Sequence, residues 1–369
     1  MSLVRIAVVS SLILHGCVGE DLGLGVAEQF AKAQPDGDGG CPPWACGSNS
    51  PIIDLGAFHE LNGMPYKPNL EGFAITAFRK FEGGTWKPYT ADVVNAWLVA
   101  KGATGNTVHT GAAVVGMVFT ITRGTQTYYM RVAELSRTPL WAKNAAGLYP
   151  STPTYRFTWS TSPPTSTTGV QVNLCGANNE HDGMADFQAV VYEADRIDAD
   201  GIKFLREEAG WFNIGCAGHL VAKQHLTGNT KAAAGLLGLA PASPNMRTAN
   251  LKMLSADYCG GGDPFTVAGT PLRWKDLSGR MNNIPAVLTN IEARWNETGA
   301  ICLNVPRVDY GWTLLGYQKF PNDVEPLLVA PAAGGQWCTG VSPAKLRPPP
   351  CTDPSLSNFG GGYLISVNQ

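Results

Sequence analysis

Residues 112–135 read AAVVGMVFTITRGTQTYYMRVAEL. Two runs rich in β-branched and aromatic residues, 112–122 and 125–135, lie on either side of Arg123-Gly124. Runs of this kind separated by a short turn that contains glycine are typical of a β-hairpin. We therefore expect an antiparallel pair of strands here, within a β-rich fold.

Other short apolar runs repeat this pattern along the chain. They lie at 73–78, at 155–159 and 169–174 on either side of a Ser/Thr/Pro-rich loop, and at 264–274, 286–295 and 299–303. Short strands at such spacing are typical of a sandwich or of barrel-like sheets.

Two segments show helical periodicity instead. Residues 211–227 (WFNIGCAGHLVAKQHLT) place Cys216 and Leu220 on one face, and residues 246–255 form a second candidate helix. The predicted fold class is therefore α+β and β-rich, with antiparallel sandwich or barrel-like sheets, two short helices and disulfide staples.

The composition favours an exported protein over a cytosolic helical enzyme. Of 369 residues only 15% are charged, and glycine (43) and proline (26) are plentiful; soluble proteins average roughly 25% charged residues. The net charge is −2, and no run of Lys and Arg predicts binding to nucleic acid or to an anionic membrane surface.

The N-terminus, MSLVRIAVVSSLILHGC, has the organisation of an export signal. Arg5 is the only charge before Cys17, and the apolar run 6–14 is shorter than the about 20 residues that a spanning helix needs. Leu-His-Gly-Cys at 14–17 resembles a lipobox. We expect residues 1–16 to be a signal peptide and Cys17 to carry the lipid that anchors the protein in a bacterial outer membrane, facing the periplasm or the cell surface. The alternatives are an ordinary cleaved signal and a misassigned start of the chain.

The cysteine count agrees with export. The chain has nine cysteines, and eight remain when Cys17 is set aside. An even number in an exported protein implies disulfides, although the sequence does not fix their connectivity. We expect the pairs Cys41–Cys46, Cys175–Cys216, Cys259–Cys302 and Cys338–Cys351, with Cys216 as the other candidate partner of Cys259.

The segment LKMLSADYCGGG at 251–262, followed by FTVAGTPL at 265–272, resembles the ADYC domain family. The family is named for the tetrapeptide present here as Ala256, Asp257, Tyr258 and Cys259. Further similar segments lie at 44–51, 71–75, 172–176, 211–218 with 222–223, 292–295 and 299–302, so the resemblance covers most of 41–310.

The resemblance implies an exported bacterial protein and an architecture, but no reaction. Some members of the family carry two more cysteines, at the places that Gln224 and roughly Asn250 occupy here. The resemblance thus implies that one disulfide has been lost as a unit.

Five regions follow from these observations. They are a signal peptide (1–16), a lipidated N-terminus with a flexible tether (17–50), a β-rich N-terminal domain (51–175), an ADYC domain (176–310) and a Pro/Gly-rich C-terminal extension (311–369).

The signature also contains the strongest catalytic candidates. A Cys259 thiolate would need a base such as His219 or His225 and an orienting carboxylate such as Asp257. The structural interpretation is that Cys259 is disulfide-bonded, that Asp257 binds backbone amides at a helix end, and that Tyr258 packs its ring with its hydroxyl at the rim.

The acidic turn at 195–201 is the main candidate for a metal, and Asp36 and Asp38 in the tether are a weaker one. Asp195, Asp198 and Asp200 precede Gly201, an arrangement that could wrap Ca²⁺, although a solvated turn is the default. No histidine spacing indicates zinc, and we expect no other cofactor.

Two functions remain open. The first is a non-enzymatic lipoprotein of the cell envelope that contacts the membrane through its lipid and binds an envelope protein or glycan. The second is a hydrolase of envelope polymers that uses Asp257 with His219 or His225.

Overall fold

The computed structural model describes residues 58–165, 171–178, 183–262, 264, 266, 272–284, 290–304, 307, 336–338, 345–346 and 348–367. The signal peptide, the lipidation of Cys17, the tether and the Cys41–Cys46 bond therefore lie outside the described residues.

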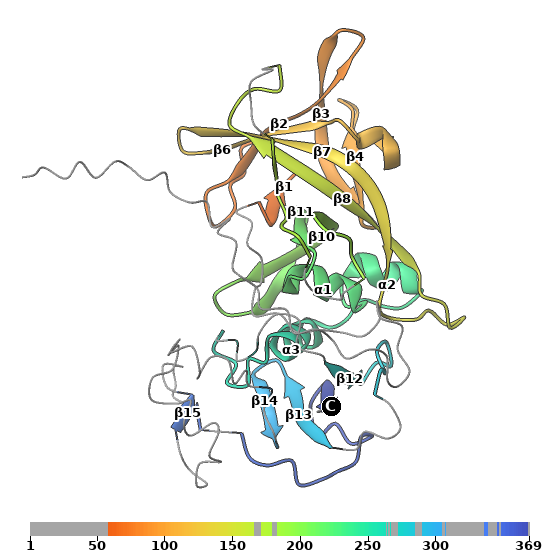
Figure 1. Cartoon of the computed structure of the whole chain (residues 1–369), viewed down its shortest axis with the longest axis vertical. Coiled ribbons are helices and arrows are strands. Elements are labelled where there is room, and N and C mark those ends of the chain that lie inside the picture. The colour runs from red at the N-terminus through yellow and green to blue at the C-terminus, as the bar shows by residue number, and fades with distance from the viewer. Residues whose placement is uncertain are drawn as a thin grey trace, which may run out of the picture.

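Most strands belong to one antiparallel sheet of 11 strands (Figure 1). They are β1 (Glu60–Asn62), β2 (Ala74–Glu82), β3 (Thr85–Val94), β4 (Trp97–Lys101), β5 (Thr107–Thr110), β6 (Val118–Arg123), β7 (Gln126–Pro139), β8 (Ser151–Ser160), β9 (Val172–Asn173), β10 (Gln188–Asp198) and β11 (Lys203–Cys216). The order is β1-β11-β10-β8-β7-β6-β2-β3-β4-β5, and β9 pairs with β8.

The hairpin expected from residues 112–135 is present. β6 and β7 pair from Val118 opposite Arg131 to Arg123 opposite Gln126, so Gly124 and Thr125 form the turn. The start of the first run is instead a 3-10 helix, η2 (Gly111–Val114).

The large sheet curls over its own core. Phe78, Phe119, Phe157 and Phe212 lie in one buried cluster, although they come from four different strands. The carboxylate of Glu193 on β10 accepts hydrogen bonds from the amides of the β3–β4 turn, at 3.0 and 3.2 Å. In the described part of the chain the end strands β1 and β5 are not paired with each other, so the sheet is not a closed barrel.

Three helices separate this sheet from a second one. They are α1 (Leu220–Leu226), α2 (Lys231–Leu237) and α3 (Pro244–Ser255). The second sheet has the order β12 (Arg273–Asp276), β17 (Leu364–Val367), β13 (Ile291–Asn296) and β14 (Gly299–Leu303). β15 (Gln336–Cys338) pairs with β16 (Lys345–Leu346).

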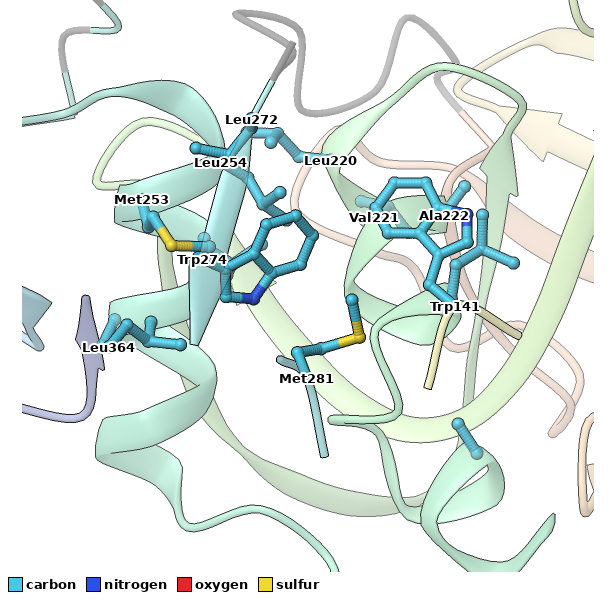
Figure 2. Close-up of a cluster of buried hydrophobic side chains, with 14 of the residues drawn as sticks. Trp141, Leu220, Val221, Ala222, Met253, Leu254, Leu272, Trp274, Met281 and Leu364 are labelled. Atoms are coloured by element: carbon cyan, nitrogen blue, oxygen red, sulfur yellow. The ribbon is translucent and has the colours of Figure 1, made fainter. Parts of the chain in front are cut away.

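The helices and the second sheet share one core. α3 contacts β11 on one side and β13, β14 and β17 on the other. Figure 2 shows Val221 from α1, Leu254 from α3, Trp274 from β12 and Leu364 from β17 converging there. The two sheets are thus joined through α3.

The predicted fold class is confirmed, with local corrections. The predicted helix 246–255 is α3, which begins two residues earlier at Pro244, after the Ser243 cap. The predicted helix 211–227 is wrong in its first half, because residues 211–216 belong to β11, where 212–216 pair with β10, and α1 begins only at Leu220. α2 was not predicted.

The structure also bears on the predicted regions. β8 and β10 are neighbours in the large sheet, so this sheet continues across residue 175. β17, from the C-terminal extension, lies between β12 and β13. Among the described residues no helix is long and apolar enough to cross a membrane.

Candidate functional site

The tetrapeptide 256–259 directly follows α3 and turns the chain back over it. Ala256 adopts a left-handed conformation (φ 55°), and the amide of Asp257 donates to the carbonyl of Lys252 at 2.8 Å. Glycine usually occupies such a helix end, because a side chain is strained there. Ala256 is completely buried, so packing holds this conformation.

Asp257 is a buried carboxylate whose oxygens are all engaged. Its Oδ2 lies 2.5 Å from Nζ of Lys252 and accepts the amide of Gly262 at 2.8 Å, while its Oδ1 accepts the amide of Gly261 at 3.1 Å. Lys252 also donates to the carbonyls of Gly201 and Gly260. Buried charges are tolerated when they are paired and hydrogen-bonded in this way. The predicted role of Asp257 in binding backbone amides is confirmed.

Two glycines, one just after the signature and one in β14, allow the backbone of neighbouring elements to approach closely. A Cβ on Gly262 would lie 1.8 Å from the carbonyl oxygen of Asp200, in the β10–β11 turn. A Cβ on Gly299, where β14 begins, would lie 2.7 Å from the carbonyl oxygen of Tyr258. The signature is therefore packed between a turn of the large sheet and a strand of the second sheet.

Tyr258 extends this contact into the second sheet. Its buried hydroxyl donates to Glu292 of β13 at 2.6 Å and accepts the amide of Arg307 at 2.6 Å. Its ring stacks on Trp295 with centroids 5.1 Å apart. Burial, followed by the charge of Glu292, raises the pKa of Tyr258 well above its usual value. The predicted position of the hydroxyl at the rim is wrong.

The guanidinium of Arg307 completes this polar cluster. Nε lies 2.6 Å from Glu292, and Nη2 donates to the carbonyl of Met253 at 2.9 Å. Glu292 is completely buried, and Arg307 supplies an opposite charge beside it. We call the set Lys252, Asp257, Tyr258, Glu292 and Arg307 the signature clamp, because it joins α3, the β10–β11 turn and the second sheet.

The calcium interpretation of the acidic turn is wrong. The carboxylate of Asp195 is completely buried and lies 2.6 Å from Arg247 of α3. Asp198 pairs with Lys203 at 3.2 Å and accepts the amide of Gly201. Within the described ranges, no group of three His, Cys, Asp or Glu side chains could hold a metal. The turn instead supplies the surface against which the signature packs.

The disulfides correct two of the expected pairs. Cys175–Cys216 is confirmed. Cys302 bonds Cys351, so the pairs Cys259–Cys302 and Cys338–Cys351 are both wrong. The reason is that residues 348–351 return along β14, where the amide of Leu303 donates to the carbonyl of Pro349 at 2.9 Å. Cys259 is itself disulfide-bonded, which removes it as a nucleophile.

The structure does not assemble the predicted acid–base pair. The partners of Asp257 are Lys252, Gly261 and Gly262, so neither histidine is hydrogen-bonded to it. His225 lies between the hydroxyls of Thr152 and Thr230, each 2.8 Å away. Burial lowers the pKa of His225 to about 3, so it is neutral near pH 7.

His219 is the N-cap residue of α1, and its side chain makes no capping hydrogen bond. It is buried, as His225 is. Both histidines therefore belong to the interior of the molecule.

A model of the ADYC domain matches residues 111–309. The chain belongs to the ADYC-domain family. The matched ADYC domain begins at η2 and includes the signature clamp up to Arg307, whereas the similar segments at 44–51 and 71–75 lie outside it. No curated protein and no solved structure matches the chain.

Sequence reasoning missed three members of the clamp, namely Lys252, Glu292 and Arg307. One signal was available for Lys252, because it stands between Leu251 and Met253 in a helix whose neighbouring residues are all buried. A lysine at such a position needs a buried carboxylate, and Asp257 follows five residues later. Arg307 carries no comparable signal, because it lies outside any regular element.

Proposed function

We propose that this protein is a lipoprotein of the cell envelope whose ADYC domain is a non-enzymatic binding or structural module. The observation that carries the proposal is the state of Asp257, which is buried and held by Lys252 and two glycine amides. Asp257 is completely buried, so its carboxylate is out of reach of a substrate or of a catalytic water at the surface. The signature therefore stabilises the fold, and a binding partner would contact the surface of the domain.

Export to the envelope is supported by the chemistry of the cysteines. Cys175–Cys216 and Cys302–Cys351 are formed, and such bonds persist in oxidising compartments. The ninth cysteine, Cys17, follows a short apolar segment in a lipobox-like sequence. We propose lipidation at Cys17 and attachment to the outer membrane, facing the periplasm or the cell surface.

Metabolic labelling tests the anchor. Cells that process lipoproteins would express the chain in the presence of an alkyne fatty acid, together with a Cys17→Ser variant. We expect label and detergent-phase partitioning for the wild type and neither for the variant. Equal labelling of both chains would contradict lipidation at Cys17.

Incubation with purified peptidoglycan sacculi tests the absence of catalysis, since a hydrolase of envelope polymers is the competing function. We expect no release of soluble fragments by the wild type, by Asp257→Asn or by His225→Gln. Release by the wild type that is lost in a folded Asp257→Asn variant would establish the hydrolase instead.

A further inference from the structure

The β2–β3 hairpin extends beyond the body of the large sheet. Glu82 pairs with Thr85, so Gly83 and Gly84 form a two-residue turn, and both have positive φ (56° and 80°). This conformation is the one that matches the twist of a tight hairpin. Figure 1 shows the hairpin projecting from the upper end of the molecule.

Two aromatic side chains occupy the tip of this hairpin. Phe81 is 56% exposed although it is a large apolar residue, and it lies opposite Trp86 in the strand register. The two ring centroids are 5.4 Å apart, and the ring planes are inclined by 59°. The pair does not form a flat platform on which a sugar ring could stack. It is instead an apolar wedge with a polar indole nitrogen, the kind of group that is enriched at membrane interfaces.

Positive charge from Lys80 and Lys87 lies on the opposite face of the same tip, because successive register pairs point to opposite faces of a hairpin. Residues 79–88 contain Arg79, Lys80 and Lys87 against Glu82, which gives a net charge of +2 from three positive groups and one negative group. Lys80 and Lys87 lie directly opposite each other on neighbouring strands. Like charges in this position repel each other, and Glu82, 3.3 Å from Lys80, already offsets part of that repulsion. Lys87 is exposed and is the lysine more available to an external anion.

The one carboxylate among residues 79–88 is already engaged. Glu82 accepts the hydroxyl of Tyr89 at 2.8 Å and lies 3.3 Å from both Lys80 and His109. It therefore offers little repulsion to an approaching anion. No run of basic residues in the sequence predicts this patch, because the hairpin assembles it from two strands.

We propose that the β2–β3 hairpin docks tip-first on an anionic lipid bilayer, with Phe81 and Trp86 at the headgroup level, Lys87 against lipid phosphates and Lys80 adding to the net positive charge of the tip. The contact goes beyond the proposed lipid anchor and does not require it. In the cell it would give the protein a second membrane contact beside the proposed lipid anchor.

Vesicle sedimentation tests the proposal with the full chain carrying Cys17→Ser, so that no lipid can be attached. Vesicles of phosphatidylcholine are compared with vesicles that also contain phosphatidylglycerol. We expect stronger partitioning to the anionic vesicles. Phe81→Ser with Trp86→Ser should lower it by about tenfold or more. Lys80→Gln with Lys87→Gln should lower it by about fivefold for each lysine, on the anionic vesicles only.

The matched control removes exposed apolar side chains elsewhere. Leu148 and Leu277 are 65% and 58% exposed, and neither belongs to the hairpin. Leu148→Ser with Leu277→Ser should leave partitioning unchanged.

The proposal is overturned if the hairpin variants bind like the wild type, if the control loses as much binding, or if the wild type binds sacculi but not anionic vesicles. None of these outcomes affects the labelling result for Cys17, so failure of this proposal and failure of the lipid anchor are distinguishable.

Discussion

The side-chain amide of Asn250 donates a hydrogen bond of 2.6 Å to the side-chain oxygen of Gln224. The bond joins α3 to α1 inside the core, where both residues are buried. Gln224 also donates to the carbonyl of Arg247 at 3.3 Å. The resemblance to the ADYC family implies cysteines at about these places in some members, where a disulfide would link the two helices. In this chain a hydrogen bond joins α1 and α3 there.

A cysteine pair should restore that link. In Gln224→Cys with Asn250→Cys we expect a disulfide that raises the free energy of unfolding by about 2–4 kcal/mol in the oxidised protein. Mass spectrometry under non-reducing conditions would show the bond, and denaturant unfolding would give the stability. Gln224→Cys alone is the control, and it should destabilise because it leaves the amide of Asn250 without this acceptor. Two free thiols in the folded double variant would contradict the expected geometry.

The tight contact between Gly262 and the β10–β11 turn predicts opposite outcomes for two glycine-to-alanine changes. Gly262 has a φ of +95°, and a Cβ there would meet the carbonyl oxygen of Asp200 at 1.8 Å. Gly235 lies in α2 with no atom within 4 Å of its Cβ position. We expect Gly262→Ala to destabilise by about 3 kcal/mol or more, or to prevent folding. Gly235→Ala should stabilise by about 0.5–1 kcal/mol. Thermal unfolding of both variants measures the two changes in stability. A Gly262→Ala variant as stable as the wild type would contradict the close contact with Asp200.

His225 predicts a loss of stability in acid. Burial lowers its pKa from 6.5 to about 3. As the pH falls below about 6.5 the unfolded chain binds a proton that the folded protein does not, so this residue alone removes about 1.4 kcal/mol per pH unit until about pH 3. Denaturant unfolding at pH 6.5, 5.5 and 4.5 measures the effect.

The pH dependence of stability in the wild type is compared with that in His225→Gln, because a second buried group changes the stability in the opposite direction. Burial raises the pKa of Asp195 to about 7, so that residue destabilises the fold as the pH rises from about 4 to 7. Only the difference between wild type and variant isolates His225. A difference that does not change with pH would contradict the prediction.

Local pattern was enough to predict several elements. The β6–β7 hairpin follows from two β-prone runs around a glycine, and α3 follows from its periodicity. Residues 211–216 were mispredicted because their apolar spacing also fits a helix. Pairing of 212–216 with β10 makes this segment a strand instead. Such pairing is set by tertiary structure, which a local pattern does not contain.

The candidate site was predictable only in part. The sequence identified Asp257 as a ligand of backbone amides and Cys259 as a disulfide cysteine, and both are correct. It did not identify Glu292 or Arg307 as partners of Tyr258, because these lie 34 and 49 residues away in sequence. The same limit explains the wrong partner for Cys302, whose true partner returns from the C-terminal extension.

The central claim is that the signature clamp holds the fold together, and a double-mutant cycle on Lys252 and Asp257 tests it most directly. The free energy of unfolding would be measured for the wild type, Lys252→Met, Asp257→Asn and the double variant. We predict that Asp257→Asn destabilises by about 3–5 kcal/mol, because it leaves a buried ammonium unpaired. The double variant should be more stable than the sum of the two single effects by at least about 1 kcal/mol. Single variants within about 0.5 kcal/mol of the wild type, or strictly additive effects, would contradict the claim.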